Sequence, residues 1–192
     1  TALISDSLKE LMNNLVLDGM PIAMICPVNF THKSLELYKY KAVIQYLSVR
    51  YNILVNLSQA PCEYIHFFES ISSRNARVSI FMLDAIELVY AASRCALAIG
   101  VNGGAMDVVA NLSECDKVLI LGTEMLNTDV SIIQQTRVRK RLPDLQECPL
   151  TFGLSDNFWP HSVNDMTRTR IWGPRESDLS LSRIKDILDA YM

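Results

Sequence analysis

Five short apolar runs, separated by segments with helical periodicity, constrain the fold of this chain most. The runs cover residues 22–26, 52–56, 77–81, 95–99 and 117–121. A short run with little polar alternation indicates a strand that is buried on both faces, which is typical of a parallel sheet. Parallel strands need crossover connections, and right-handed crossovers lay helices against the sheet. The sequence therefore predicts a Rossmann-like α/β three-layer sandwich with a central parallel sheet of about five strands.

Amphipathic helices are expected between and around these strands. Segments with apolar residues at helical spacing cover 5–17, 33–50, 62–70, 84–93 and the residues from Gly104 to Asn111. Beyond the fifth strand we expect a helix over 128–141, a loop-rich segment over 143–178 and a terminal helix near 180–191. No repeat or linker separates these segments, so residues 1–192 are predicted to form a single Rossmann-like domain.

The composition argues against several classes of protein. The 192 residues are 49% hydrophobic and carry a formal charge of -3, which excludes disorder and provides no overall attraction for nucleic acid or an anionic membrane. No apolar run approaches the roughly 18 residues that span a bilayer, so no transmembrane segment is expected. The five cysteines form no C-x-x-C pair and the three histidines are scattered. We therefore expect no metal site and a reducing, cytoplasmic location.

Two loops form the candidate ligand site. Ligands of parallel α/β sheets bind at the carboxyl ends of the strands, where successive crossovers diverge to opposite faces. For a strand order of 3-2-1-4-5 this point lies between the first and fourth strands, so residues 27–33 and 100–107 are expected at one edge of the sheet. Gly100, Gly103 and Gly104 would let the backbone approach a phosphate or carboxylate at the helix start. The alternative is structural, because tight strand-to-helix turns favour glycine and the G-x-G-x-x-G spacing is absent.

The segment 83–110 runs from a helix through a strand into the turn Asn-Gly-Gly-Ala-Met-Asp. This pattern resembles the nucleotide-sugar-binding half of GT-B-fold glycosyltransferases, especially the heptosyltransferase-like family. Members of that family have an Asn-Asp-Ser-Gly-x-Met-His-type turn at this place. Here Gly104 and Met106 match the turn, Asn102 is a near substitute for its acid, and Asp107 stands where the family has histidine.

The resemblance covers roughly residues 20–123 and implies a sugar nucleotide as ligand and glycosyl transfer as activity. In the family the turn holds the sugar and phosphates of the donor, and a lysine after the first strand neutralises the diphosphate. The donor-binding residues that the resemblance implies are Lys33, Asn102, Gly103, Gly104 and Asp107. It implies no cofactor and identifies no catalytic residue. Since family members close two Rossmann-like domains around donor and acceptor, a second domain or partner subunit is expected to complete the cleft.

Two other functions remain open from the sequence. A non-catalytic Rossmann-like binding or interaction module would fit the short chain, the aspartate at position 107 and the absence of an evident catalytic base. A different sugar-phosphate or nucleotide enzyme is the second alternative, because fold alone does not determine function. The basic run over 137–141 is interpreted as complementing the end of a helix, so no nucleic-acid partner is expected.

Overall fold

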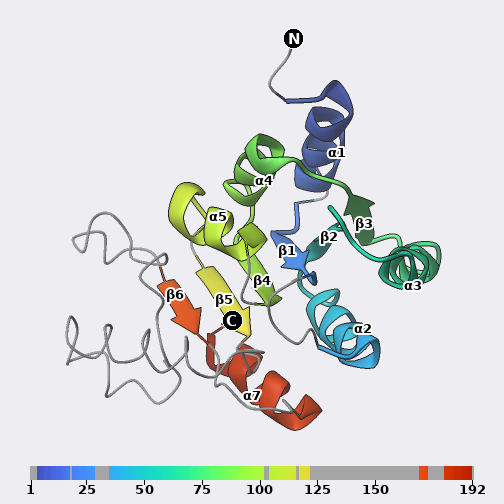
Figure 1. Ribbon diagram of the computed structural model, residues 1–192, viewed down its shortest axis with the longest axis vertical. Coiled ribbons are helices and arrows are strands. Elements are labelled where there is room, and N and C mark those ends of the chain that lie inside the picture. The colour runs from blue at the N-terminus through green and yellow to red at the C-terminus, as the bar shows by residue number, and fades with distance from the viewer. Residues whose placement is uncertain are drawn as a thin grey trace.

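The computed structural model describes residues 4–17, 19–28, 35–101, 104–115, 117–121, 169–172 and 180–191. Within them, strands and helices alternate along most of the chain (Figure 1). The strands are β1 (Ile22–Cys26), β2 (Asn52–Asn56), β3 (Val78–Phe81), β4 (Leu97–Val101), β5 (Lys117–Leu121) and β6 (Thr169–Trp172). The helices are α1 (Asp6–Leu17), α2 (Leu37–Leu47), α3 (Cys62–Ser72), α4 (Ala85–Ala92), α5 (Gly104–Leu112) and α7 (Leu181–Tyr191).

The described strands form one sheet in the order β3-β2-β1-β4-β5-β6, and every neighbouring pair is parallel. The predicted order of the first five strands and their parallel direction are confirmed. β1 lies inside the sheet, where Ala23 faces Ile53 of β2 on one side and Leu97 of β4 on the other. The fold is therefore a Rossmann-like α/β fold, as the apolar runs predict.

β6 lies within 143–178, the segment for which the sequence predicts loops. It pairs with β5 and adds a sixth strand to the sheet. Its four residues, Thr-Arg-Ile-Trp, include β-prone side chains, but a run this short has no period that distinguishes it from the turn formers around it. The rest of that segment and the predicted helix over 128–141 lie outside the described residues.

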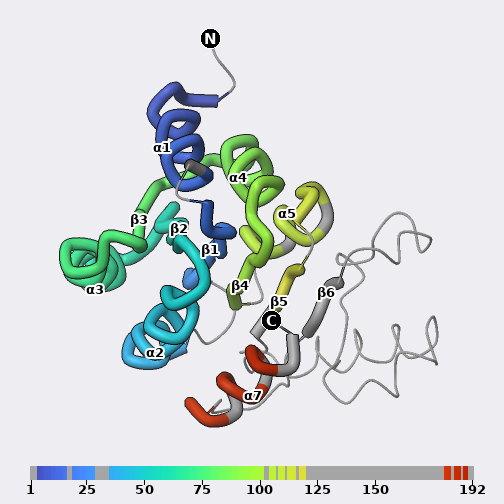
Figure 2. The backbone as a smooth tube through the Cα atoms, turned by 180° about the vertical axis from the view of Figure 1, so that it is seen from behind, coloured from blue at the N-terminus to red at the C-terminus, as the bar shows by residue number. Residues whose placement is uncertain are grey.

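The helices cover both faces of the sheet (Figure 2). On one face, α2, α3 and α7 contribute the buried side chains Tyr40, Val43, Ile44, Leu47, Phe68, Ile184 and Leu188. On the other face, α1, α4 and α5 contribute Leu8, Met12, Leu15, Leu88, Ala91, Ala92, Met106, Val109 and Ala110. Strand residues alternate between the two cores, as the pleat requires. The predicted three-layer sandwich is confirmed.

Two elements begin at least two residues later than predicted. β4 begins at Leu97 rather than at Cys95, because the Cys95 N–H donates to the carbonyl of Ala92 at 3.0 Å and so belongs to the turn that follows α4. α2 begins at Leu37, later than the predicted helix over 33–50. Apolar periodicity places an element well but not its ends, which depend on local hydrogen bonds.

The described cysteines Cys26, Cys62, Cys95 and Cys115 are free thiols. All but Cys62 are buried, and a buried thiol packs as a small hydrophobic side chain. In the part of the chain that the structure describes, no three His, Cys, Asp or Glu side chains are placed to hold a metal ion. None of the described helices is long and apolar enough to cross a membrane.

Candidate functional site

A crevice of about 330 Å³ opens where β1 and β2 end and α4 and α5 begin. The residues that line it are Cys26, Val28, Asn56, Ser58, Gln59, Leu83, Asp84, Ala85, Leu88, Gly104, Ala105 and Val108. β1 is followed by a helix on one face of the sheet and β4 by a helix on the other, so the crevice lies beside the switch point where ligands of α/β sheets bind. Val28 and Gly104, which are described residues of the two candidate loops, both line it, so these residues lie at one edge of the sheet as predicted.

Carboxylates occupy the start of α4. The Asp84 Oδ1 atom accepts the N–H of Ile86 at 2.9 Å and that of Glu87 at 2.8 Å, and the Glu87 side chain accepts the N–H of Asp84 at 3.4 Å. This capping box binds N–H groups that a helix start otherwise leaves open, and its charge complements the helix dipole. The α4 start therefore presents a carboxylate to the crevice. A carboxylate suits hydroxyl donors better than anions.

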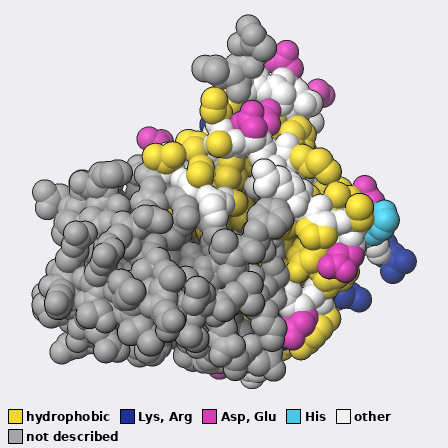
Figure 3. Space-filling view, viewed as in Figure 1, with side chains coloured by type: hydrophobic (Ala, Val, Ile, Leu, Met, Phe, Trp, Pro, Cys, Tyr) yellow, Lys and Arg dark blue, Asp and Glu magenta, His cyan; other side chains and the backbone are white. Residues whose placement is uncertain are grey.

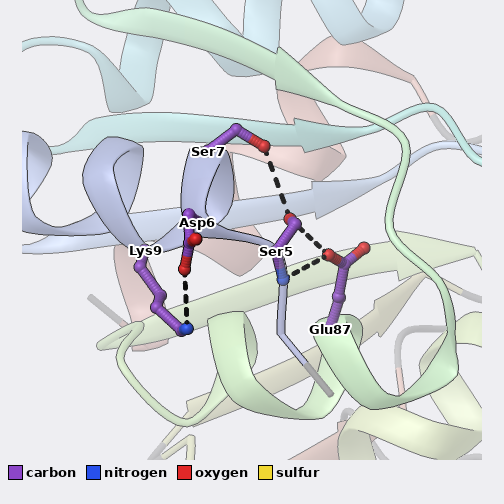
Figure 4. Close-up of polar contacts among 5 residues, drawn as sticks. All are labelled: Ser5, Asp6, Ser7, Lys9 and Glu87. Carbon is purple, nitrogen blue, oxygen red and sulfur yellow. Dashed lines mark hydrogen bonds and ion pairs between the residues drawn. The ribbon is translucent and has the colours of Figure 1, made fainter. Parts of the chain in front are cut away.

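Glu87 also connects α4 to α1. Its Oε1 atom accepts the Ser5 N–H at 3.2 Å and the Ser5 hydroxyl at 2.5 Å (Figure 4). Ser5 immediately precedes α1, and its carbonyl accepts the N–H of Lys9 at 3.1 Å. Lys9 itself pairs with Asp6 at 2.9 Å on the surface of α1. The wall of the crevice at α4 is thus held by α1 as well as by the sheet.

The start of α5 is open. Gly104, the first residue of α5, lines the crevice, and a Cβ atom added there would meet nothing within 4 Å. Gly100 is different, because a Cβ atom there would lie 2.5 Å from Met106 Sδ and 2.7 Å from the carbonyl oxygen of Cys26. The missing side chain of Gly100 therefore serves the packing of α5 and β1 against β4, rather than the approach of a ligand.

A buried hydrogen-bond cluster lines the crevice between β1 and α4. Asn56, which is only 4% exposed, accepts the N–H of Ser58 at 3.1 Å and that of Leu83 at 3.2 Å through Oδ1. The Ser58 hydroxyl donates to the carbonyl of Leu83. Burial raises the pKa of the Cys26 thiol to about 12, and a hydrogen bond with Asn56 opposes this rise. At neutral pH Cys26 is therefore an uncharged thiol and not a nucleophile.

Gln59 has a φ angle of 58°, in the left-handed region that costs most side chains about 1–2 kcal/mol. It lies in a turn that the N–H of Ala60 closes by donating to the carbonyl of Leu57 at 3.0 Å. Strained residues of this kind cluster at binding sites, where the surrounding structure holds them in place. Its position at the crevice is consistent with a ligand-binding turn.

The charge of the crevice is set by Asp84 and the two helix starts. Among the described residues, none that lines it is a Lys or Arg. On the face shown in Figure 3, the described surface is mostly hydrophobic or uncharged, with acidic side chains spread over it. A cation for a diphosphate would have to come from outside the described lining, for example from Lys33.

The structure describes only some of the predicted donor-binding residues. Gly104 lies at the crevice, as expected. Lys33, Asn102 and Gly103 lie outside the described residues. Asp107 belongs to α5, but its side chain lies outside what the structure describes. The donor-binding role of all five residues stays a prediction.

The sequence analysis gave no role to Asn56 and Ser58, and it did not identify Asp84 as the cap of α4. The capping box could have been found, because Asp84 and Glu87 have the acid-x-x-Glu spacing that marks a helix start. Asn56 ends an apolar strand, which places it at the carboxyl edge of the sheet. Its bond to Ser58 is local, but its bond to Leu83 could not have been found, because Leu83 belongs to a connection far from Asn56 in the sequence.

Comparison with known proteins gives a likeness in structure. No family model matches the sequence, and no curated protein matches it. The fold is similar to the solved structure of E. coli ADP-heptose LPS heptosyltransferase II, with a TM-score of 0.56 and 15% sequence identity. The match covers 97% of this chain and 51% of that chain, so this chain spans about half the length of the enzyme that it matches. The chain thus has the fold of one half of a GT-B glycosyltransferase, as the resemblance of its sequence implies.

Proposed function

We propose that this chain is the sugar-nucleotide-binding half of a GT-B-like glycosyltransferase and that the donor binds in the crevice. One observation carries this proposal: the open start of α5 at Gly104 lines a crevice at the switch point of a heptosyltransferase-like fold. A sugar nucleotide combines hydroxyl groups with a diphosphate. The crevice offers a carboxylate for the hydroxyl groups and helix-start N–H groups for the phosphates.

Each part of the donor has a matching group in this proposal. The diphosphate lies at the α5 start beside Gly104, with Asn102 and Gly103 in the preceding turn and Lys33 as the neutralising cation. Asp84 accepts hydrogen bonds from donor hydroxyl groups, and Asp107 stands on the first turns of α5 near the sugar. When the glycosidic bond breaks, negative charge develops on the leaving diphosphate, and the same N–H groups and cation stabilise it.

The acceptor site and the catalytic base belong, in this proposal, to a second domain or a partner subunit. This chain spans about half of the matched enzyme, and closing a second Rossmann-like domain over the crevice would exclude water from the donor. We therefore expect this chain alone to bind the donor but to show little transfer. A cytoplasmic location, predicted from the cysteines, is part of the same proposal.

A non-catalytic binding module is the second candidate, and Asp84 favours it. The carboxylate at the α4 start repels a diphosphate, and none of the described lining residues is a cation that offsets it. A neutral ligand with several hydroxyl groups would fit such a crevice without a counter-charge.

Calorimetric titration of the protein with ADP-, GDP-, UDP- and CMP-linked sugars tests the proposed function. Lys33→Ala is expected to weaken binding by about tenfold, the value of one charge-assisted contact to phosphate. Lys41→Ala is the matched control, because Lys41 is an exposed lysine of α2 that does not line the crevice. If the wild-type protein binds none of these donors, the proposed role of the crevice is contradicted. If the wild type and both variants bind equally well, the proposed role of Lys33 is contradicted.

The two candidates differ in their preference for charge. Binding of sugar nucleotides in preference to the corresponding neutral sugars and nucleosides supports the transferase half. Binding of the neutral compounds alone supports the non-catalytic module.

A further inference from the structure

One buried amide, that of Asn56 at the end of β2, accepts hydrogen bonds from two connections around the crevice. Its Oδ1 atom accepts the N–H of Ser58 at 3.1 Å, in the connection from β2 to α3. The same atom accepts the N–H of Leu83 at 3.2 Å, in the connection from β3 to α4. Asn56, Ser58 and Leu83 line the crevice together with Cys26, the last residue of β1.

This cluster is costly to disturb because it is shielded from water. Asn56 is 4% exposed, Leu83 is 3% exposed and Cys26 is 1% exposed. Removing one partner of a buried hydrogen bond leaves the other without water or protein to replace it. The Oδ1 atom of Asn56 has two lone pairs, so it can accept both N–H groups at once.

We propose that Asn56 is a positioning residue of the crevice, which sets its affinity for ligand by fixing the α4 start relative to the end of β2. Leu83 immediately precedes Asp84, the residue that caps α4, so the bond from Leu83 to Asn56 holds the capping carboxylate in place. If the α4 start is already fixed in the free protein, ligand binding loses less conformational entropy in ordering it. The smaller loss of entropy gives a higher affinity. This inference rests on the proposed function, because the ligand is the donor assigned there.

Asn52 provides a matched control in the same strand. It begins β2 where Asn56 ends it, and it is 3% exposed. Its amide donates to the carbonyl of Leu15 at 3.0 Å, at the edge of the sheet opposite the crevice. If buried asparagines in β2 serve only stability, substitutions at the two positions will have the same consequences. If Asn56 positions the crevice, only its substitution will change ligand binding beyond the loss of stability.

The test compares Asn56→Leu with Asn52→Leu in the intact protein. Calorimetry with the tightest-binding sugar nucleotide gives the affinity, and urea unfolding gives the stability. We expect both variants to lose stability, whereas Asn56→Leu alone loses about tenfold or more in affinity, the value of a lost buried hydrogen bond. Amide hydrogen exchange at Ser58 and Leu83 is expected to accelerate in Asn56→Leu and to stay unchanged in Asn52→Leu.

Asn56→Asp keeps the inference testable if Asn56→Leu does not fold. Its carboxylate still accepts both N–H groups, so slow amide exchange at Ser58 and Leu83 is expected in this variant. Equal affinity loss in the two leucine variants, or unchanged affinity in Asn56→Leu, would overturn the positioning role while leaving the proposed function intact. Absence of binding by the wild type would overturn both.

Discussion

The helices α4 and α5 both begin at the crevice, but α4 begins with two carboxylates and α5 begins with a glycine. At α4 the N–H groups of Ile86 and Glu87 are bound by Asp84, so the helix start is satisfied from within the chain. At α5 the first residue has no side chain, and the space beside it is empty. The helix start at one wall of the crevice is thus capped by a side chain, whereas the start at the other wall has space beside its first residue.

The two helix starts also differ in charge. Negative charge from Asp84 offsets the positive end of the α4 dipole, whereas Gly104 brings no charge to the start of α5. An anionic group of a ligand is therefore expected near α5, and a group that donates hydrogen bonds is expected near α4. Variants at these helix starts, and at Gly100 where α5 packs on β4, test this difference.

Gly100→Val is expected to have the largest effect. Its Cβ atom would overlap Met106 Sδ and the backbone carbonyl of Cys26, and the carbonyl cannot rotate away as a side chain can. Overpacking of this kind costs about 2 to 3 kcal/mol of unfolding free energy. Urea unfolding measures the loss, with Gly104→Ala as control at an open position. An unchanged unfolding midpoint would mean that α5 does not depend on close contact with β4.

Asp84→Ala removes the cap and is expected to cost about 1 kcal/mol, because the N–H groups of Ile86 and Glu87 lose their acceptor. Asp84→Asn keeps an acceptor of the same shape and should cost less than about 0.5 kcal/mol. Thermal unfolding of both variants checks this order.

Asp84→Asn should also bind sugar nucleotides more tightly, since the negative charge that repels the diphosphate is gone. Weaker binding by this variant would show that the donor needs the charge at the α4 start.

Glu87→Gln is expected to cost about 0.5 kcal/mol. It keeps the size of the side chain but weakens the contacts with the N–H and hydroxyl of Ser5, which are partly exposed to water. Unfolding at low and high salt measures the electrostatic share of the loss, which should shrink as salt screens the charge. A loss as large as that of Asp84→Ala would place the main cap of α4 at Glu87.

Gly104→Ala is expected to change stability by less than about 0.5 kcal/mol, because its backbone is outside the left-handed region and its Cβ atom meets no neighbour. The methyl group nevertheless occupies space at the helix start where the proposal places a phosphate. Calorimetry should therefore show weaker donor binding in a protein of normal stability. Unchanged affinity would move the phosphate away from α5.

Much of the fold follows from the sequence because its strands are apolar on both faces. Runs such as 22–26 and 117–121 predict buried parallel strands, and crossover handedness then restricts their order. β6 could not be predicted in this way, because its residues Thr-Arg-Ile-Trp include a charged side chain and form no apolar run. Cys95 is apolar enough to resemble a strand residue, but its N–H bond to Ala92 assigns it to the turn that follows α4.

The candidate site is predictable in position but not in detail. The topology rule leads to the loops after β1 and β4, and Val28 and Gly104 do line the crevice. Gly100 is needed because Met106 packs against it, and Asn56 acts through its hydrogen bond with Leu83. The sequence does not show that either pair of residues is in contact. Glycines alone cannot show whether they make room for a ligand or for a neighbouring side chain.

The seam between β1 and β4 has a consequence for folding kinetics. β1, β2 and β3 pair with strands near them in the sequence, as do β4 and β5, whereas Ala23 must find Leu97 across most of the described chain. Such long-range closure is slow, because the entropy of a large loop is lost before the contacts form. Gly100 faces Cys26 across this seam, and the crevice is bounded by residues from both of its sides. A half-folded intermediate with either strand group alone therefore lacks the binding site, so the ligand can stabilise only the completed sheet.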